Sequence, residues 1–297
     1  MRVIYISGSG RSGSTLLERI LHSAAPAAAV GEFHCLWRMD RQALNCACGH
    51  SAQDDAFWPR TLAAAGIGAA ELAELRRLEA IVARSGYVAR HGHRIAALAA
   101  APETQAFLGL QLRIFEAIAA QTGQNLIIDS SKAGPRAWIM ACDPRVSLVH
   151  LYRAPGDVIA SWRSRKFDKG LGGEMQRLSL GRAALDWWKV EHLARRLARE
   201  RPVHMIDYHQ LCAQPRPVVD GALAALGLAP TRNEAWLAAD RVAPTQDYHS
   251  LNGNPDRFER SPIAIALRQT DWGRYPPAER QAIKCLGQAL SLAYPRP

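Results

Sequence analysis

Arg2-Val3-Ile4-Tyr5-Ile6, then Ser7-Gly8-Ser9-Gly10-Arg11-Ser12-Gly13-Ser14-Thr15, then Leu16-Leu17-Glu18-Arg19-Ile20-Leu21 open the chain and decide its fold. The apolar first segment predicts a strand, the glycine-rich middle a turn, and the amphipathic end a helix. Glycines let backbone N–H groups converge on an anion, and the N-terminus of the helix adds partial positive charge. The stretch therefore predicts an anion-binding cradle in an α/β fold.

The cradle has the glycine spacing of a P-loop but lacks the P-loop lysine. Gly8 and Gly13 match G-x-x-x-x-G-K-[ST], and Thr15 occupies the hydroxyl position. Ser14 stands where the lysine is expected, and the cation of the turn is Arg11. We therefore expect an anionic group to bind here without the lysine that serves a nucleoside triphosphate.

The composition favours a small anionic ligand. The chain has 297 residues, 48% of them hydrophobic, which is enough for one large α/β domain or two small ones. Lys and Arg number 37 against 27 Asp and Glu, a net charge of +10 that suits a polyanion, nucleic acid or a membrane surface. The arginines are spread along the chain, aromatic residues are only 7%, and no apolar run reaches membrane-spanning length. We expect a cytoplasmic protein with no nucleic-acid partner and no membrane span.

The cysteines do not form a recognisable metal motif. Cys46 and Cys48 are clustered, but no second pair follows at zinc-finger spacing. His34, Cys35 and His50 lie near them in sequence and make a metal site conceivable. We favour a reduced Cys-x-Cys turn and expect no metal. The six cysteines are at positions 35, 46, 48, 142, 212 and 285.

Strands and helices alternate along the chain, which predicts a parallel sheet covered on both faces. A short strand or a strand end is expected at about 30–33. Further strands are expected at about 125–129, 146–153 and 203–208, and helices at about 69–78, 103–120, 181–200, 215–226 and 277–292. Residues of about 40–120 form a mostly helical insertion that we expect to cap the site. The prediction is one domain over residues 1–297, with its ligand at the carboxyl ends of the strands.

The opening loop resembles that of a known enzyme family. Arg11-Ser12-Gly13-Ser14-Thr15-Leu16-Leu17 is similar to the 5′-phosphosulfate-binding loop of sulfotransferases that use 3′-phosphoadenosine 5′-phosphosulfate (PAPS). The resemblance implies a P-loop-NTPase-like three-layer fold with a central parallel sheet. It also implies that the loop binds the donor through Ser9, Gly10, Arg11, Ser12, Gly13, Ser14 and Thr15.

Two later segments extend the resemblance to the nucleotide. Leu151-Tyr152-Arg153-Ala154-Pro155-Gly156-Asp157-Val158-Ile159-Ala160-Ser161-Trp162 is similar to the family's 3′-phosphate motif, in which Arg153 and Ser161 hold that phosphate. A guanidinium gives paired N–H donors to phosphate oxygens, and serine adds a hydroxyl. Asn252-Gly253-Asn254-Pro255-Asp256-Arg257-Phe258 resembles the family's late loop, which implies a third phosphate contact from Arg257. A plain surface turn is the alternative there.

The resemblance also implies catalytic residues. In tyrosylprotein and carbohydrate sulfotransferases a glutamate in a Gly-Glu step is the base, and Glu32 matches it. His34 is the rival base, because other members of the superfamily use histidine. Lys132, at the end of Asp129-Ser130-Ser131-Lys132, would neutralise charge on the leaving 5′-phosphate, and Arg11 would stabilise the sulfuryl oxygens.

The resemblance as a whole implies a bacterial, PAPS-dependent sulfotransferase that releases 3′,5′-adenosine bisphosphate (PAP). The acceptor would be a hydroxyl or amine of a small molecule, a sugar or a lipid. Two alternatives stay open. One is a small-molecule kinase that uses ATP and Mg²⁺, against which the missing lysine counts. The other is a non-catalytic protein that binds anions or nucleic acid, as the net charge of +10 allows.

Overall fold

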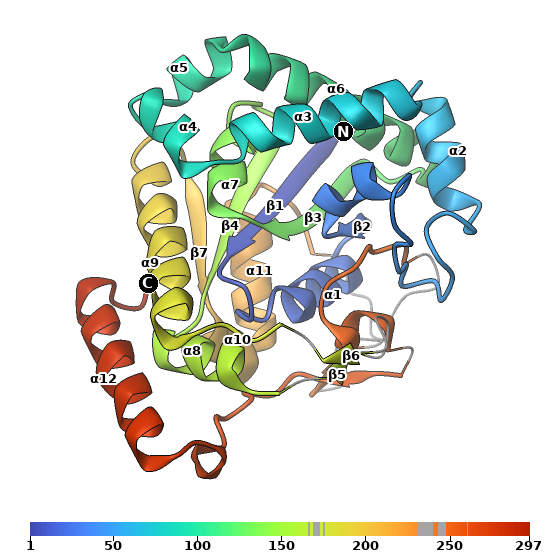
Figure 1. Ribbon diagram of the computed structural model, residues 1–297. Coiled ribbons are helices and arrows are strands. Elements are labelled where there is room, and N and C mark those ends of the chain that lie inside the picture. Colours follow the sequence, from blue (N-terminus) through green and yellow to red (C-terminus); the bar gives the residue numbers. More distant parts are fainter. Residues whose placement is uncertain (166, 169–172, 175, 231–239, 243–247, 260) are drawn as a thin grey trace.

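Five parallel strands form the central sheet of the computed structural model, in the order β2-β3-β1-β4-β7 (Figure 1). The structure describes residues 1–297 apart from 166, 169–172, 175, 231–239, 243–247 and 260. The chain first fills the side of β1 that carries β3 and β2, and then crosses to add β4 and β7 on the other side. This reversal beside β1 creates a crevice at the carboxyl ends of the strands. The strands are β1 (Arg2–Gly8), β2 (Ala28–Gly31), β3 (Leu126–Lys132), β4 (Val146–Tyr152) and β7 (Val203–Asp207).

Helices cover both faces of the sheet, as the alternation of side chains in β1 requires. Val3 and Tyr5 belong to a core cluster that includes side chains of α3 (Ala69–Val82), α6 (Pro102–Thr122), α7 (Gly134–Met140) and α9 (Leu180–Leu197). Ile4 and Ile6 belong to a second cluster, with α1 (Ser14–Ala24), α10 (Tyr208–Ala213) and α11 (Pro215–Ala225). The result is a three-layer α/β fold, which confirms the predicted fold class.

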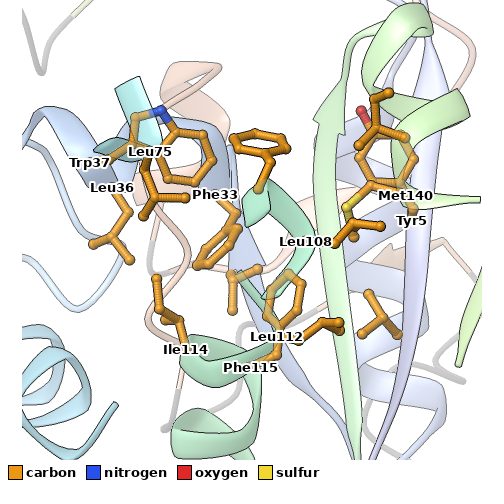
Figure 2. Close-up of a cluster of buried hydrophobic side chains, with 14 of the residues drawn as sticks. Tyr5, Phe33, Leu36, Trp37, Leu75, Leu108, Leu112, Ile114, Phe115 and Met140 are labelled. Atoms are coloured by element: carbon orange, nitrogen blue, oxygen red, sulfur yellow. The ribbon is translucent and has the colours of Figure 1, made fainter. Parts of the chain in front are cut away.

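Aromatic side chains join the helical region of about 40–120 to the sheet (Figure 2). The ring of Phe33 stacks on Phe115 of α6 with centroids 4.5 Å apart, and Trp37 meets Phe33 edge-on at 5.7 Å. Such pairs add about 0.5–1.5 kcal/mol each beyond the area they bury. The helices of this region therefore form part of the core. Besides α3 and α6 they are α2 (Phe57–Ala64), α4 (Ser85–Arg90) and α5 (Ile95–Ala100).

The remaining elements surround the open end of the sheet. Pro155 begins α8 (Pro155–Arg163), and the final helix α12 (Pro277–Ala293) packs on α8 so closely that a Cβ on Gly287 would lie 2.8 Å from the Cα of Gly156. The short elements are η1 (Phe33–Arg38), β5 (Phe167–Asp168), β6 (Gly173–Glu174), β8 (Arg241–Val242), η3 (Pro255–Phe258), β9 (Ile263–Ala264) and η4 (Trp272–Arg274).

The segment at about 30–33 is a strand end, one of the two readings predicted for it: the strand stops at Gly31, and Phe33 begins η1. The backbone turns at Glu32, whose N–H donates to the carbonyl of Leu251 and not to a sheet neighbour. This departure places the Glu32 side chain at the edge of the crevice.

Candidate active site

A cavity of about 540 Å³ lies at the carboxyl ends of β1, β2 and β3. The loop after β1, Glu32 after β2 and Lys132 at the end of β3 contribute side chains to the same space. From the helical region of about 40–120, only Gln42, Ala43 and Asn45 are among the described residues lining it. The lining residues are Gly10, Arg11, Gly13, Ser14, Thr15, Glu32, Gln42, Ala43, Asn45, Lys132, Trp162, Glu174, Gln176, Asn252, Gly253, Asn254 and Phe258.

The loop between β1 and α1 has the form that an anion cradle needs. Gly13 has φ 100°, and a Cβ at this position would lie 2.4 Å from the ring of Tyr208, so only glycine fits. The first N–H groups of α1 follow directly, and a helix leaves them without intrahelical partners. Ser14 and Thr15 line the cavity, whereas Ser9 and Ser12 are buried, with 3% and 0% of their surface exposed. The hydroxyls of Ser9 and Ser12 thus belong to the inside of the loop.

Glu32 and Lys132 form an ion pair at the floor of the cavity. The Nζ of Lys132 donates to the Oε1 of Glu32, and each side chain is 19% exposed. Adjacent parallel strands bring the two residues together, because Gly31 of β2 pairs with Asp129 of β3. Lys132 adopts φ 70°, a left-handed conformation that non-glycine residues seldom take. Backbone strain of this kind is concentrated at functional sites.

The ion pair keeps Glu32 ionised. Burial acts to raise the pKa of its carboxyl, but the charges of Lys132 and Arg257 outweigh burial and lower the pKa to about 2. A carboxylate so stabilised is a weak base while Lys132 stays on it. Any partner that draws Lys132 away strengthens Glu32 as a proton acceptor.

His34 lies behind the cavity. Its backbone N–H donates to the Oγ of Ser131 at 3.3 Å, and its side chain is not among the described residues that line the cavity. Burial lowers the pKa of its imidazole to about 3. Of these two residues, only Glu32 is among the described residues that line the cavity.

A second cavity, of about 360 Å³, brings the predicted phosphate pair together. Arg153, at the end of β4, and Ser161, on α8, both line it. The guanidinium of Arg153 donates to the carbonyls of Arg11 (2.9 Å) and Arg268 (3.2 Å) and lies over the ring of Tyr208. Its Nε is buried without a hydrogen-bond partner among the described residues. An anionic ligand in the cavity could accept the hydrogen bond of this unpaired donor.

Arg268 and Arg274 were missed by the sequence reasoning. They line the second cavity and bring two more guanidinium groups to it, although each also pairs with an aspartate, Asp256 and Asp271 respectively. They lie beyond the last motif, in a segment without periodicity. No signal in the sequence separates them from the other arginines of the chain.

A narrow cavity of about 50 Å³ adjoins both of the larger ones. It shares Arg11, Gly13 and Thr15 with the first cavity, and Arg153 and Arg268 with the second. The three cavities therefore form a row from the Glu32 carboxylate, past the N-terminus of α1, to Arg153 and Ser161. Arg11 lies along this row, with its guanidinium 5.0 Å from the ring centre of Trp162.

The structure does not place Arg257 at the predicted 3′-phosphate contact. Arg257 is fully buried, and its terminal nitrogens donate to the Oε2 of Glu18 (2.7 Å), the Oγ of Ser130 (2.8 Å) and the carbonyls of Leu251 and Asn252. These four contacts use all four N–H bonds of the two terminal nitrogens. Arg257 thus supports the late loop from below and does not reach the second cavity.

Comparisons with known proteins show the family and the fold. A family model described as "Sulfotransferase family" matches residues 3–232. A solved sulfotransferase domain from the curacin biosynthetic pathway superposes with a TM-score of 0.54 at 17% identity, covering 100% of this chain and 98% of that one. A sulfotransferase domain from the olefin synthase of Synechococcus PCC 7002 gives 0.48 at 18% identity, over 100% and 95% of the two chains. At 17% identity, the match to the curacin-pathway domain is evidence for the fold alone.

No curated protein matches this chain. Among the described residues, no helix has both the length and the apolar character needed to cross a bilayer.

Proposed function

The chain belongs to the sulfotransferase family, and we propose that it transfers the sulfuryl group of PAPS to a hydroxyl or amine acceptor. The observation that carries the proposal is the row of adjoining cavities that runs from Glu32 to Arg153 and Ser161. The second cavity offers cations for a 3′-phosphate, and the loop offers N–H groups for the 5′-phosphosulfate. PAPS needs both at once.

In the proposed reaction Glu32 takes the proton of the acceptor while the acceptor oxygen or nitrogen attacks sulfur. The bond between sulfur and the bridging oxygen breaks, and that oxygen leaves with the 5′-phosphate of PAP. Lys132 stabilises the charge that grows on the leaving oxygen, and Arg11 with the N–H groups of Ser14 and Thr15 stabilises the sulfuryl oxygens. The remaining rate enhancement comes from holding the acceptor in line with the breaking bond, as in phosphoryl transfer.

The acceptor binds, on this proposal, in the 540 Å³ cavity beside Glu32. The lining includes the amides Gln42, Asn45 and Gln176 and the aromatic residue Phe258. Amides that can donate and accept hydrogen bonds beside an aromatic surface suit a hydroxylated acceptor, such as a sugar or another small polyol-like molecule.

We expect Arg153→Ala to weaken PAP binding by about 10- to 150-fold, because charge-assisted hydrogen bonds contribute about 1.5–3 kcal/mol. Binding of 5′-AMP, which lacks the 3′-phosphate, is expected to change much less. Calorimetric titration of both nucleotides into both proteins measures this difference. An equal loss for PAP and 5′-AMP would mean that Arg153 only supports the fold, and would remove it from the phosphate site.

We expect Lys132→Met to bring an acid limb from Glu32 into the pH profile of kcat/KM. In the wild type the pKa of Glu32 is about 2, so the carboxylate is ionised throughout the range in which proteins stay folded, and we expect no acid limb from Glu32. Without the Lys132 charge, burial raises the pKa of Glu32, and protonation then inactivates the base as the pH falls. Profiles for the two proteins that share the same acid limb would contradict the assignment of Glu32 as base.

A further inference from the structure

Four metal-binding side chains from two distant segments meet beside the late loop. Cys46, Cys48 and Asp55 lie between η1 and α2, and His249 lies about two hundred residues further on. The two Sγ atoms, the Oδ2 of Asp55 and the Nδ1 of His249 all lie within 4.8 Å of one another. None of these side chains belongs to the described lining of the three cavities.

The distances within the group match the edges of a small tetrahedron. Bonds of about 2.3 Å from zinc to sulfur and about 2.0–2.2 Å to nitrogen or oxygen set neighbouring ligand atoms about 3.3–3.8 Å apart. The Oδ2 of Asp55 is 3.6 Å from the Sγ of Cys46 and 3.2 Å from that of Cys48, and the Nδ1 of His249 is 3.8 Å from the Sγ of Cys46. Among these four contacts, the one between Asp55 and His249, at 2.7 Å, has to open slightly.

We propose that Cys46, Cys48, Asp55 and His249 bind a structural zinc ion. Two thiolates, an imidazole and a carboxylate form a set that zinc accepts and that Mg²⁺ and Ca²⁺ do not prefer. Four protein ligands leave no open position for a substrate, which is the pattern of a structural site and not of a catalytic one. The inference goes beyond the proposed sulfuryl transfer, and it replaces the expectation that the chain has no metal.

Neighbouring groups already orient the ligands. The Oδ1 of Asp55 accepts the N–H of Phe57 at 3.1 Å, which turns Oδ2 toward the other three ligand atoms. The ring of Phe57 stacks on His249 with centroids 4.1 Å apart and an angle of 3°. Partners of this kind fix metal ligands and raise affinity. Cys46 is 1% exposed and the His249 side chain 23%, so the group is sheltered and still reachable by an ion from solvent.

The zinc ion would hold the late loop in place at the edge of the sheet, beside Glu32. Cys46 forms an isolated bridge with Leu251, and Ala47 donates its N–H to the carbonyl of Ser250 at 2.9 Å. Leu251 in turn accepts the N–H of Glu32. Asn252, Gly253 and Asn254 follow at once and line the 540 Å³ cavity. A metal at this place therefore sets the position of one wall of the active site without touching the reacting atoms.

The test is the metal content of full-length protein made without a polyhistidine tag in zinc-supplemented medium. After desalting, the wild type is expected to hold about one zinc per chain by mass spectrometry. The variant Cys46→Ser/Cys48→Ser is expected to hold almost none, and the control Cys212→Ser/Cys285→Ser is expected to keep the wild-type content. Metal content is measured without an activity assay, so the result tests the zinc site separately from the proposed sulfuryl transfer.

Cobalt supplies a second measurement that does not depend on a damaging variant. Wild-type protein loaded with Co²⁺ is expected to show the visible bands of tetrahedral cobalt and a near-ultraviolet band from thiolate-to-cobalt charge transfer. Asp55→Cys is expected to keep the metal and to strengthen the charge-transfer band by adding a third thiolate. A folded wild type that holds no zinc and gives no cobalt bands would overturn the proposal and leave a hydrogen-bonded cluster. Loss of zinc in the Cys212→Ser/Cys285→Ser control would overturn it as well.

Discussion

Replacing Glu32 by glutamine is expected to lower kcat for sulfuryl transfer by about 10²- to 10⁴-fold, the range that a positioned general base contributes. Glutamine has nearly the same volume, and its Oε1 can still accept a hydrogen bond from Lys132, so the cavity should keep its shape. It cannot take a proton from the acceptor. PAP binding should therefore stay close to the wild-type value while turnover falls. The rates are measured with sulfur-labelled PAPS and an acceptor selected from a panel of sugars, phenols and fatty alcohols.

His34→Gln is the matched control for this experiment. His34 is not among the described residues that line the cavity, and its backbone N–H is held by Ser131, so its ring is not placed to take a proton from an acceptor there. We expect its loss to change kcat far less than the loss of the Glu32 carboxylate. If His34→Gln gives the larger decrease in kcat, the base is His34 and the proposed proton transfer is wrong.

Arg257→Ala is expected to lower the free energy of unfolding by about 3–5 kcal/mol, because it leaves a buried carboxylate without its cation. Arg257 and Glu18 are both fully buried and lie 2.7 Å apart. Glu18 also accepts the hydroxyls of Tyr248 (2.9 Å), Ser250 (2.5 Å) and Ser130. This network ties α1, which carries the anion-binding loop, to β3 and to the late loop. Denaturant unfolding measures the change.

Two controls make the Arg257 result specific. Arg182→Ala removes an exposed ion pair with Asp186 on α9 and should change stability by less than about 1 kcal/mol. Arg257→Lys keeps the buried charge and should leave the preference for PAP over 5′-AMP unchanged. If this preference disappears in a folded Arg257→Lys protein, Arg257 reaches the 3′-phosphate after all. A stability loss in Arg257→Ala no larger than in Arg182→Ala would contradict the structural role.

The fold could be predicted because its signals are local: the strand, glycine turn and amphipathic helix that open the chain, and the alternation of strands and helices after them. Glu32 and Lys132 could be placed near each other for a similar reason, since both follow strands whose carboxyl ends meet at one edge of a parallel sheet. The role of Arg257 could not be predicted. Its partner Glu18 lies 239 residues earlier, and nothing local shows that both are buried.

The partners of Cys46 and Cys48 could not be predicted from the sequence either, because one of them is distant along the chain. Among the histidines and cysteines, His34, Cys35 and His50 lie closest in sequence to Cys46 and Cys48, and they suggested no complete ligand set. The structure instead brings Asp55 and the distant His249 to the two sulfurs. His249 stands directly before the late loop, so only the tertiary fold, which lays that loop across Cys46, could have identified it.

The most direct measurement of the central claim is calorimetric titration of the wild-type protein with PAP, 5′-AMP and ATP with Mg²⁺. The proposed site predicts that PAP binds without metal and at least about tenfold more tightly than 5′-AMP, because the 3′-phosphate meets Arg153 and Ser161. Binding of ATP with Mg²⁺ as tight as or tighter than that of PAP would contradict the sulfotransferase assignment of this site and favour a kinase.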